Sequence, residues 1–172
     1  MKKLIFLLIL SSFIAFSCKK NNSSNQTCQF QPSTIIAPIA EQTALHDSLV
    51  AHEIEATMDP SGFFYKINEP GSGPTVKDLC TTVAVFYKGT FFNGKVFDST
   101  STGTPAIFQV GRVIPGWQKA IPLIAKGGDI TLYIPPSLAY GSNNVVNPNT
   151  GDTIIRANSN LVFHVQLADL QQ

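Results

Sequence analysis

Apolar and polar residues alternate along several short segments of the chain, namely residues 83–87, 106–110, 130–134 and 161–167. Successive side chains of a β-strand point to opposite faces of a sheet, so this period predicts strands that each bury one face. In the first segment Val83, Val85 and Tyr87 share a face, so we expect Tyr87 to lie beside core aliphatic residues. Short strands of this kind predict an antiparallel sheet.

Turn residues separate these segments. Residues 59–62 read Asp-Pro-Ser-Gly and predict a turn before a first strand over residues 62–67, which ends at a loop over residues 69–74. The pair Asn93-Gly94 lies between two short apolar segments and is the strongest hairpin signal in the chain, because both residues tolerate a positive φ. The sheet therefore contains at least one tight hairpin.

Two segments predict helices. Residues 117–124 form a stretch too short to be stable alone, and Pro122 removes a backbone donor from it, so this helix must lie against the sheet. Residues 39–53 have helical composition, with Leu45 and Leu49 one turn apart. That stripe is too narrow for a long dimer seam, so we expect packing on the domain. The fold class is α+β, with a short N-terminal helical extension.

The N-terminus has the pattern of an export signal. Lys2 and Lys3 precede an uncharged apolar run over residues 4–16, shorter than the roughly 18 residues that a spanning helix needs. A small residue followed by Cys18 predicts a lipoprotein, in which Cys18 carries lipid and begins the mature chain. The residues before Cys18 depart from the commonest cleavage pattern, so an ordinary secreted protein is the alternative.

These signals divide the chain into four parts. We expect a signal peptide over residues 1–17 and a flexible tether over residues 18–35, which is rich in Asn, Ser and Gln and has little to bury. An N-terminal extension with the short helix follows over residues 36–61. The main domain occupies residues 62–172.

Composition narrows the possible partners. The chain has 172 residues, 44% hydrophobic and 13% charged, which suits one domain with attachments. Without Lys2 and Lys3, 10 basic residues face 11 acidic ones, so no strong field for nucleic acid follows. If Cys18 carries lipid, Cys28 and Cys80 remain. An exported compartment permits a disulfide between them, although Cys28 as a free thiol in a mobile segment fits equally well.

Metal and nucleophile motifs are weak in this sequence. His46 and His52 are six residues apart in the expected helix, the wrong spacing for two ligands on one face, and His164 alternates outward on its strand. A Ser/His/Asp set in recognisable context and a phosphate-binding glycine loop are both missing from the sequence. We therefore expect no metal and no cofactor.

A set of ordered blocks carries the functional signal: residues 85–89 (Val-Phe-Tyr-Lys-Gly), 94–99 (Gly-Lys-Val-Phe-Asp-Ser), 113–117 (Val-Ile-Pro-Gly-Trp), 127–128 (Gly-Gly), 134–141 (Ile-Pro-Pro-Ser-Leu-Ala-Tyr-Gly) and 161–163 (Leu-Val-Phe). Their order resembles the FKBP-type peptidyl-prolyl cis/trans isomerases from about residue 63 to the C-terminus. The resemblance implies a twisted antiparallel sheet, a half barrel, wrapped around a short helix, with an aromatic pocket for an Xaa-Pro peptide.

The resemblance also implies roles for individual residues. Trp117 is the pocket floor on which the prolyl ring sits, and Ile114 offers its backbone N–H to the peptide. Tyr140 offers a hydroxyl to a substrate carbonyl, and Asp98 lies beside the bound amide. The alternative role for Asp98 is that of a turn or capping residue. The implied walls are Tyr87, Phe97, Phe108, Val113, Ile114 and Phe163, with Ile155 as a further candidate.

The sequence departs from the family in two places. Ala106 replaces a bulky pocket residue of many relatives, which lowers one wall and puts the binding of macrolide-type inhibitors in doubt. The loop over residues 142–153 is longer than usual and is followed by Ile155-Arg156-Ala157. Since this loop overhangs the pocket in relatives, substrate preference is not carried across, and Arg156 is a candidate to meet acidic substrate segments.

The expected function is that of a lipid-anchored prolyl isomerase in the bacterial cell envelope, at the outer membrane, which assists the folding of proline-containing exported proteins. One alternative is a module that holds proline-containing segments in the same cleft without catalysis. Another is a structural envelope lipoprotein with a vestigial pocket. Membrane contact would come through the lipid on Cys18.

Overall fold

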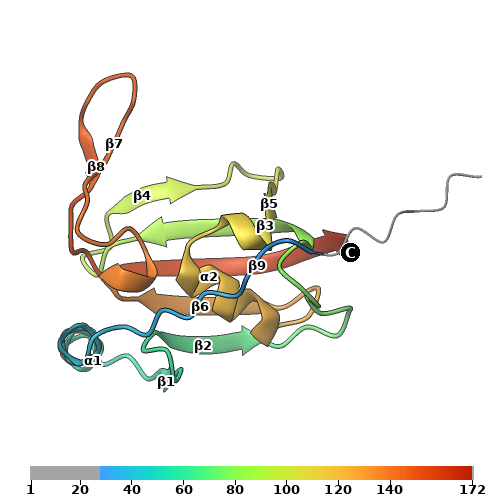
Figure 1. Ribbon diagram of the computed structural model, residues 1–172, viewed down its shortest axis with the longest axis horizontal. Coiled ribbons are helices and arrows are strands. Elements are labelled where there is room, and N and C mark those ends of the chain that lie inside the picture. The colour runs from blue at the N-terminus through green and yellow to red at the C-terminus, as the bar shows by residue number, and fades with distance from the viewer. Residues whose placement is uncertain (1–27, 172) are drawn as a thin grey trace, which may run out of the picture.

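The structure is a computed structural model that describes residues 28–171 (Figure 1). The expected signal peptide over residues 1–17, the lipidation site Cys18 and the first part of the tether lie outside the described residues. Within residues 28–171, no helix is both long and apolar enough to cross a membrane.

A twisted antiparallel sheet forms the body of the protein, in the order β1-β2-β6-β9-β3-β4, with β5 paired to β3 beyond the end of β4 (Figure 1). Its strands are β1 (Thr57–Met58), β2 (Phe64–Glu69), β3 (Thr82–Thr90), β4 (Val96–Ser99), β5 (Ala106–Gln109), β6 (Asp129–Ile134) and β9 (Leu161–Gln171). The α+β class predicted from the alternating segments is confirmed. The Asn93-Gly94 hairpin is confirmed as well, with Phe91 N donating to Lys95 O at 3.0 Å.

The long strand β9 occupies the centre of the sheet, between β6 and β3. Its alternating residues Leu161, Phe163, Val165 and Leu167 are all at most 4% exposed, as their period of two predicts. His164, on the opposite face, is exposed and lies 2.9 Å from Asp129. One face of β9 thus builds the main core.

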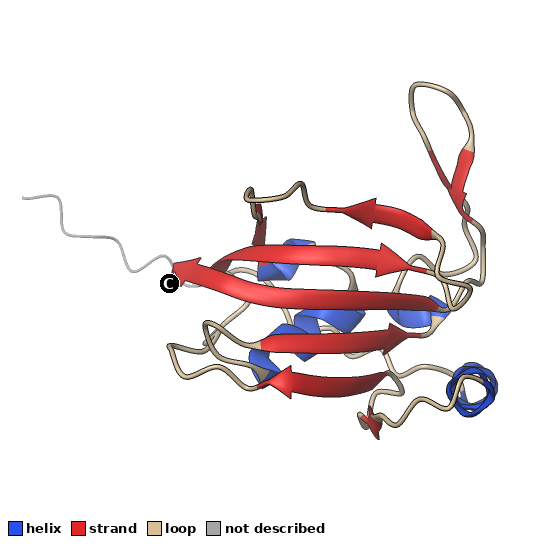
Figure 2. Cartoon of the chain, turned by 180° about the vertical axis from the view of Figure 1, so that it is seen from behind, coloured by secondary structure: helices blue, strands red, loops and turns tan. Residues whose placement is uncertain are grey.

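Helix α2 (Pro115–Ala120) covers that core face, and a 3₁₀ turn, η2 (Ile121–Leu123), follows it (Figures 1 and 2). The helix begins two residues before the expected start, because Pro115 suits the first helical position, where no N–H is needed. Pro122 falls in the 3₁₀ turn, outside α2. A Cβ on Gly116 would lie 2.8 Å from Ile134 Cδ1, so glycine lets the helix approach the sheet closely.

Helix α1 (Ile39–Ala51) packs on the other face of the sheet, at one edge. Leu45 and Leu49 are buried against Phe64 and Tyr133. Tyr133 alternates with buried core residues on β6, so its ring leaves the sheet on the face opposite α2. The prediction that this helix packs on the domain is confirmed.

The segment before α1 is fixed to the domain, which corrects the flexible tether expected over residues 18–35 for its described part. A disulfide joins Cys28 to Cys80, so this cysteine is not the free thiol of the open alternative. Residues 28–38 then cross the α2 side of the molecule (Figure 1). Lys119 Nζ donates to Ser33 O at 2.8 Å, and Ala37 is 2% exposed. We call residues 28–38 the strap.

The expected loop over residues 142–153 is a hairpin that projects from one end of the sheet (Figures 1 and 2). Its strands are β7 (Val145–Val146) and β8 (Thr153–Ile155). Asn147 N donates to Asp152 O at 2.8 Å and closes the tip. Two short hydrogen-bonded strands thus replace the irregular loop that the Asn, Pro and Gly content indicated.

Candidate functional site

A pocket of about 270 Å³ opens above α2, between the helix and the near edge of the sheet. It brings together residues that are up to 76 positions apart in the chain. Its lining residues are Tyr87, Asp98, Phe108, Arg112, Val113, Ile114, Trp117, Tyr140 and Phe163.

The lining side chains come from several elements that are distant in the sequence. Tyr87 and Phe163 come from the neighbouring strands β3 and β9, and Asp98 from β4. Two further lining residues, Val113 and Ile114, lie in the connection from a 3₁₀ turn, η1 (Val110–Arg112), to α2. Tyr140 follows a third 3₁₀ turn, η3 (Pro136–Leu138), after β6. The sheet and α2 therefore fix the geometry of the site.

Trp117 forms the floor of the pocket. Although it is only 4% exposed, its indole borders the pocket and meets three other rings at nearly right angles. Their centroids lie 5.4 Å (Tyr87), 5.9 Å (Phe108) and 5.3 Å (Phe163) from that of Trp117. Edge-to-face contacts of this kind are the favoured arrangement of aromatic pairs, so the floor is held rigidly. The buried indole Nε1 has no hydrogen-bond partner among the described residues.

A short hydrogen bond crosses one wall of the pocket. The Tyr87 hydroxyl donates to Asp98 Oδ2 at 2.6 Å. Burial, and then this hydrogen bond to a carboxylate, raise the pKa of Tyr87 above its ordinary value. Thr100 fixes the backbone of Tyr87, because the Thr100 N–H donates to Tyr87 O at 3.0 Å. Tyr87 therefore remains a neutral donor, and Asp98 keeps one oxygen for other partners.

Two further donors at the pocket, the Tyr140 hydroxyl and the Ile114 N–H, have no acceptor among the described residues. The Tyr140 side chain is 41% exposed, and its hydroxyl has no acceptor among the residues that the structure describes. Burial and the nearby charge of Asp98 raise the pKa of Tyr140, so this hydroxyl also keeps its proton. Within the same part of the chain, the Ile114 N–H donates to no acceptor.

Arg112 is a lining residue that the sequence analysis did not single out. Its Nε donates to Gln109 Oε1 at 3.1 Å, and its guanidinium carbon lies 5.9 Å from the centre of the Phe30 ring. A signal was present in the sequence, because Arg112 directly precedes Val113 and Ile114, both expected in the wall. Arg156, the cation considered for acidic substrates, is exposed but does not line the pocket.

Two residues expected in the wall lie outside the pocket lining. Phe97 packs against Phe163, with ring centroids 5.4 Å apart, and covers Gly89, where a Cβ would lie 2.6 Å from the Phe97 ring. Phe97 therefore supports the wall from behind. Ile155 is 3% exposed, pairs with Val145 at the base of the β7-β8 hairpin, and belongs to the main core. Ala106 pairs with Val85 and also lies outside the lining.

The arrangement suits binding and conformational chemistry. Apolar rings form most of the surface, and a few oriented hydrogen-bonding groups stand at its margin. Among the described residues, one cluster has three side chains of the kinds that bind metals, namely Cys28, Asp78 and Cys80. Both cysteine sulfur atoms of this cluster are joined in the disulfide. It lies outside the pocket lining. A small apolar group with hydrogen-bonding neighbours is the kind of ligand that this pocket fits.

Comparison with known families identifies the family of this chain. Residues 73–168, more than half of the chain, match the family described as FKBP-type peptidyl-prolyl cis-trans isomerase. The chain belongs to this FKBP-type family. The match includes all nine residues that line the pocket.

Curated FKBP-type relatives are longer than this chain. The FKBP-type peptidyl-prolyl cis-trans isomerase FkpA of Escherichia coli (strain K12) is 45% identical over 112 residues, which cover 64% of this chain and 38% of that protein. The outer membrane protein MIP of Legionella longbeachae is 41% identical over 116 residues, which cover 66% and 46%. The chain thus spans less than half of the length of these two relatives.

Solved structures show the same FKBP-type fold. The crystal structure of FkpA from Escherichia coli has a TM-score of 0.64 at 38% identity and covers 77% of this chain and 60% of that one. The peptidyl-prolyl cis-trans isomerase from Pseudomonas syringae pv. tomato has a TM-score of 0.64 at 29% identity, covering 79% and 98%. The half-barrel expected from the resemblance is confirmed.

Proposed function

We propose that this protein is a peptidyl-prolyl cis/trans isomerase that assists the folding of proline-containing polypeptides. The observation that carries the proposal is the pocket of about 270 Å³, floored by Trp117 and lined by Tyr87, Phe108 and Phe163 in a chain of the FKBP-type family. A prolyl ring fits such an apolar recess, and the preceding amide then lies at its polar margin.

Rotation about an Xaa-Pro bond breaks no covalent bond but loses amide resonance, across a barrier of roughly 18 to 20 kcal/mol. The twisted amide carries less charge on its oxygen than the planar one. Moving it from water into an aromatic pocket therefore disfavours the planar form more, and this difference lowers the barrier. The protein needs neither a nucleophile nor a metal for this step.

The polar groups at the margin orient the peptide. The Ile114 N–H is available to a peptide carbonyl, and the Tyr140 hydroxyl to a second one. Asp98, held by Tyr87 at 2.6 Å, keeps an acceptor beside the amide. Each factor of ten in rate needs about 1.4 kcal/mol, so a few contacts that strengthen in the twisted state supply useful catalysis.

An isomerisation assay on the mature chain, residues 18–172, tests this proposal. A protease-free assay with a neutral Xaa-Pro peptide should show acceleration at micromolar enzyme. Tyr140→Phe should lower kcat/KM about tenfold, because an oriented hydrogen bond contributes about 1.4 kcal/mol. Asp98→Leu should also lower it. Tyr65→Phe, on β2 and outside the pocket, is the matched control and should behave as wild type.

Wild-type protein no faster than buffer would overturn the enzymatic proposal. Titration of the same peptide against Trp117 fluorescence then identifies what the pocket does. Saturable binding without acceleration would make the protein a module that holds proline-containing segments. No fluorescence response would indicate a vestigial pocket. A macrolide-type inhibitor, which we propose as a further ligand of the same pocket, should compete in either assay.

We further propose an envelope location, with the mature chain anchored by lipid on Cys18. The export pattern over residues 1–17 supports it, as does the relative named outer membrane protein MIP. Mass spectrometry of the protein from a bacterial membrane fraction should find a diacylglyceryl group on Cys18. A mature N-terminus at another residue would overturn the lipid anchor while leaving the proposed activity untouched.

A further inference from the structure

Arg112 places a positive charge at the margin of a pocket that is otherwise aromatic. It stands at the end of η1, directly before the residues that lead into α2, and its side chain is exposed. Arg112 is the only cationic residue among the nine that line the pocket within the described part of the chain. A peptide whose proline sits on Trp117 therefore passes close to this guanidinium.

The guanidinium has donors to spare. Its one hydrogen bond to the described residues uses Nε, which leaves the Nη atoms without an acceptor there. No described carboxylate forms an ion pair with it, and residues 1–27 contain no Asp or Glu. The one carboxylate that lines the pocket, Asp98, is bonded instead to Tyr87. An arginine fork with free Nη atoms matches the geometry of a carboxylate.

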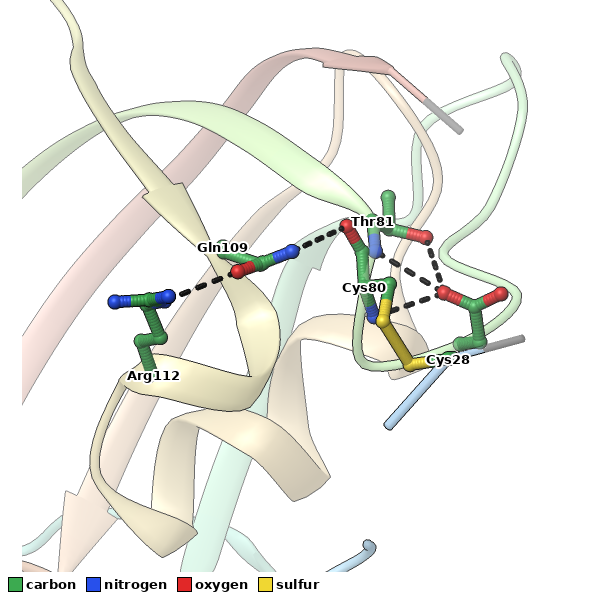
Figure 3. Close-up of a disulfide and its surroundings, with 6 residues drawn as sticks. Cys28, Cys80, Thr81, Gln109 and Arg112 are labelled. Carbon is green, nitrogen blue, oxygen red and sulfur yellow. Dashed lines mark hydrogen bonds between the residues drawn. A yellow bond between two sulfur atoms is a disulfide. The ribbon is translucent and has the colours of Figure 1, made fainter. Parts of the chain in front are cut away.

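The strap holds Arg112 in place from behind. Gln109 connects Arg112 to Cys80. Its Oε1 accepts a hydrogen bond from Arg112, and its Nε2 donates to Cys80 O at 3.2 Å (Figure 3). Cys80 in turn is joined to Cys28 by the disulfide, as Figure 3 shows. The Phe30 ring, two residues along the strap from Cys28, lies beneath the guanidinium at 5.9 Å.

The packing around Phe30 leaves little freedom at this point. A Cβ built on Gly111 would overlap the Phe30 ring, so the ring lies directly on the backbone next to Arg112. A cation above an aromatic face is attracted by the ring quadrupole. The aromatic contact and the Gln109 hydrogen bond therefore fix the direction in which the guanidinium points before any peptide arrives.

We infer that Arg112 is a specificity-determining residue that favours peptides with an acidic side chain near the proline, and that Phe30 and the Cys28–Cys80 disulfide position it. The inference rests on the proposed function, because it concerns the substrates of the same pocket. An exposed ion pair is weak, so the preference is about three- to fivefold at low ionic strength. It shrinks as salt screens the exposed charges.

Matched peptides test the preference. Glu and Gln are compared at the position before the proline and at the position after it, because the two side chains differ in charge and hardly in size. Wild type should show a kcat/KM ratio of Glu to Gln of about three to five at one or more positions. In Arg112→Gln the ratio should fall to about one at every position. Lys66→Gln, an exposed cation on β2, is the charge-matched control and should keep the wild-type ratio.

The strap variants test positioning rather than charge. Phe30→Leu keeps an apolar side chain but removes the aromatic face, so the Glu-to-Gln ratio should fall. Phe30→Tyr keeps the aromatic face, so it should keep the wild-type ratio. The double variant Cys28→Ser/Cys80→Ser should also lower the ratio. Circular dichroism identifies any variant that has lost its fold. A ratio that is the same in Phe30→Leu and wild type would overturn the positioning role of the strap.

The outcomes separate this inference from the proposed function. Turnover of a neutral peptide with equal rates for Glu and Gln peptides overturns the inference and leaves the isomerase intact. A preference that survives in Arg112→Gln overturns the role of Arg112. If no peptide is turned over, dissociation constants from Trp117 fluorescence replace kcat/KM. The Glu peptide should then bind three- to fivefold more tightly than the Gln peptide, because an exposed ion pair contributes about 1 kcal/mol at most. Equal dissociation constants overturn the inference.

Discussion

A single hydroxyl shows how burial and charge act together at this site. Tyr87 shares its face of β3 with the buried residues Val83 and Val85, yet its hydroxyl reaches the polar margin and donates to Asp98. Burial and that hydrogen bond both favour the protonated phenol. The ring is thus a wall of the apolar pocket, and its polar end orients the acceptor beside the peptide.

The raised pKa of Tyr87 predicts how stability depends on pH. Above about pH 10 the unfolded chain loses the tyrosine proton while the folded protein keeps it, so the free energy of unfolding falls as pH rises. Below about pH 10 both states are protonated and the contribution is fully present. Tyr87→Phe removes this proton, so its stability should fall less steeply above that pH.

Urea unfolding at a series of pH values measures this slope. Comparison of each protein with its own stability near neutral pH removes any pH-independent effect of the substitution. A shallower but still measurable fall in stability with rising pH is expected in Tyr87→Phe, because burial also raises the pKa of Tyr133 and Tyr140. Equal slopes in variant and wild type would contradict the raised pKa of Tyr87.

Single residues also mark the limit of what the sequence predicts at this site. The rings of Trp117, Phe108 and Phe163 were expected in the pocket and line it, since alternation and ordered blocks define both face and neighbourhood. Phe97 and Ile155 were expected there too but lie behind it or away from it. Which ring lies in front depends on contacts between strands, such as Phe97 over Gly89, and alternation within one strand carries no information about them.

At the scale of elements, α1 shows how a short helix gains stability from one row of side chains. Leu45 is 0% exposed and Leu49 is 3% exposed, and both pack on Phe64 and Tyr133. Most of the other residues of the helix are exposed, with Val50 at 62%. A helix of 13 residues is marginal in water alone, so this contact with the sheet holds it.

Leu45→Ala should therefore destabilise the protein. Removing a fully buried leucine leaves a cavity, and such substitutions cost about 2 to 5 kcal/mol. Val50→Ala, on the exposed side of the same helix, should change the free energy of unfolding by no more than about 0.5 kcal/mol. Urea unfolding followed by circular dichroism measures both. Similar stabilities of the two variants would mean that α1 does not pack on the sheet as described.

Elements with strong local signals were predictable, and those that depend on distant partners were not. The hairpin at Asn93-Gly94 follows from turn chemistry, and α1 follows from its spacing. The hairpin of β7 and β8 was expected as a loop, because its composition is that of a loop and its pairing is only a few residues long. The strap was expected to be flexible, since nothing local indicates that Cys28 reaches Cys80, 52 residues away.

At the scale of the molecule, the disulfide closes a large part of the chain into a loop. It joins Cys28, at the start of the strap, to Cys80, two residues before β3, and thereby connects the strap to the sheet. Restricting the unfolded chain over a separation of 52 residues stabilises the folded state by about 4 kcal/mol in the chain-entropy account. The strap is thus part of the folded unit rather than an attachment to it.

Removal of this disulfide should lower the free energy of unfolding by about 2 to 4 kcal/mol. The double variant Cys28→Ser/Cys80→Ser and the wild-type protein in reductant should show the same loss in urea unfolding. Addition of reductant to the double variant is the control and should change nothing. Coincident unfolding curves for oxidised and reduced wild type would contradict the predicted contribution.

The central place of β9 has a consequence for how the molecule is made. Its partners β3 and β6 come earlier in the chain, so a ribosome that has synthesised residues 1–160 holds two strands whose facing edges lack their shared neighbour. The nascent chain stays open until its last strand emerges, and such long-range closure is slow. Until then the unpaired edges of β3 and β6 can pair with other chains, so the late position of β9 exposes the chain to association during synthesis.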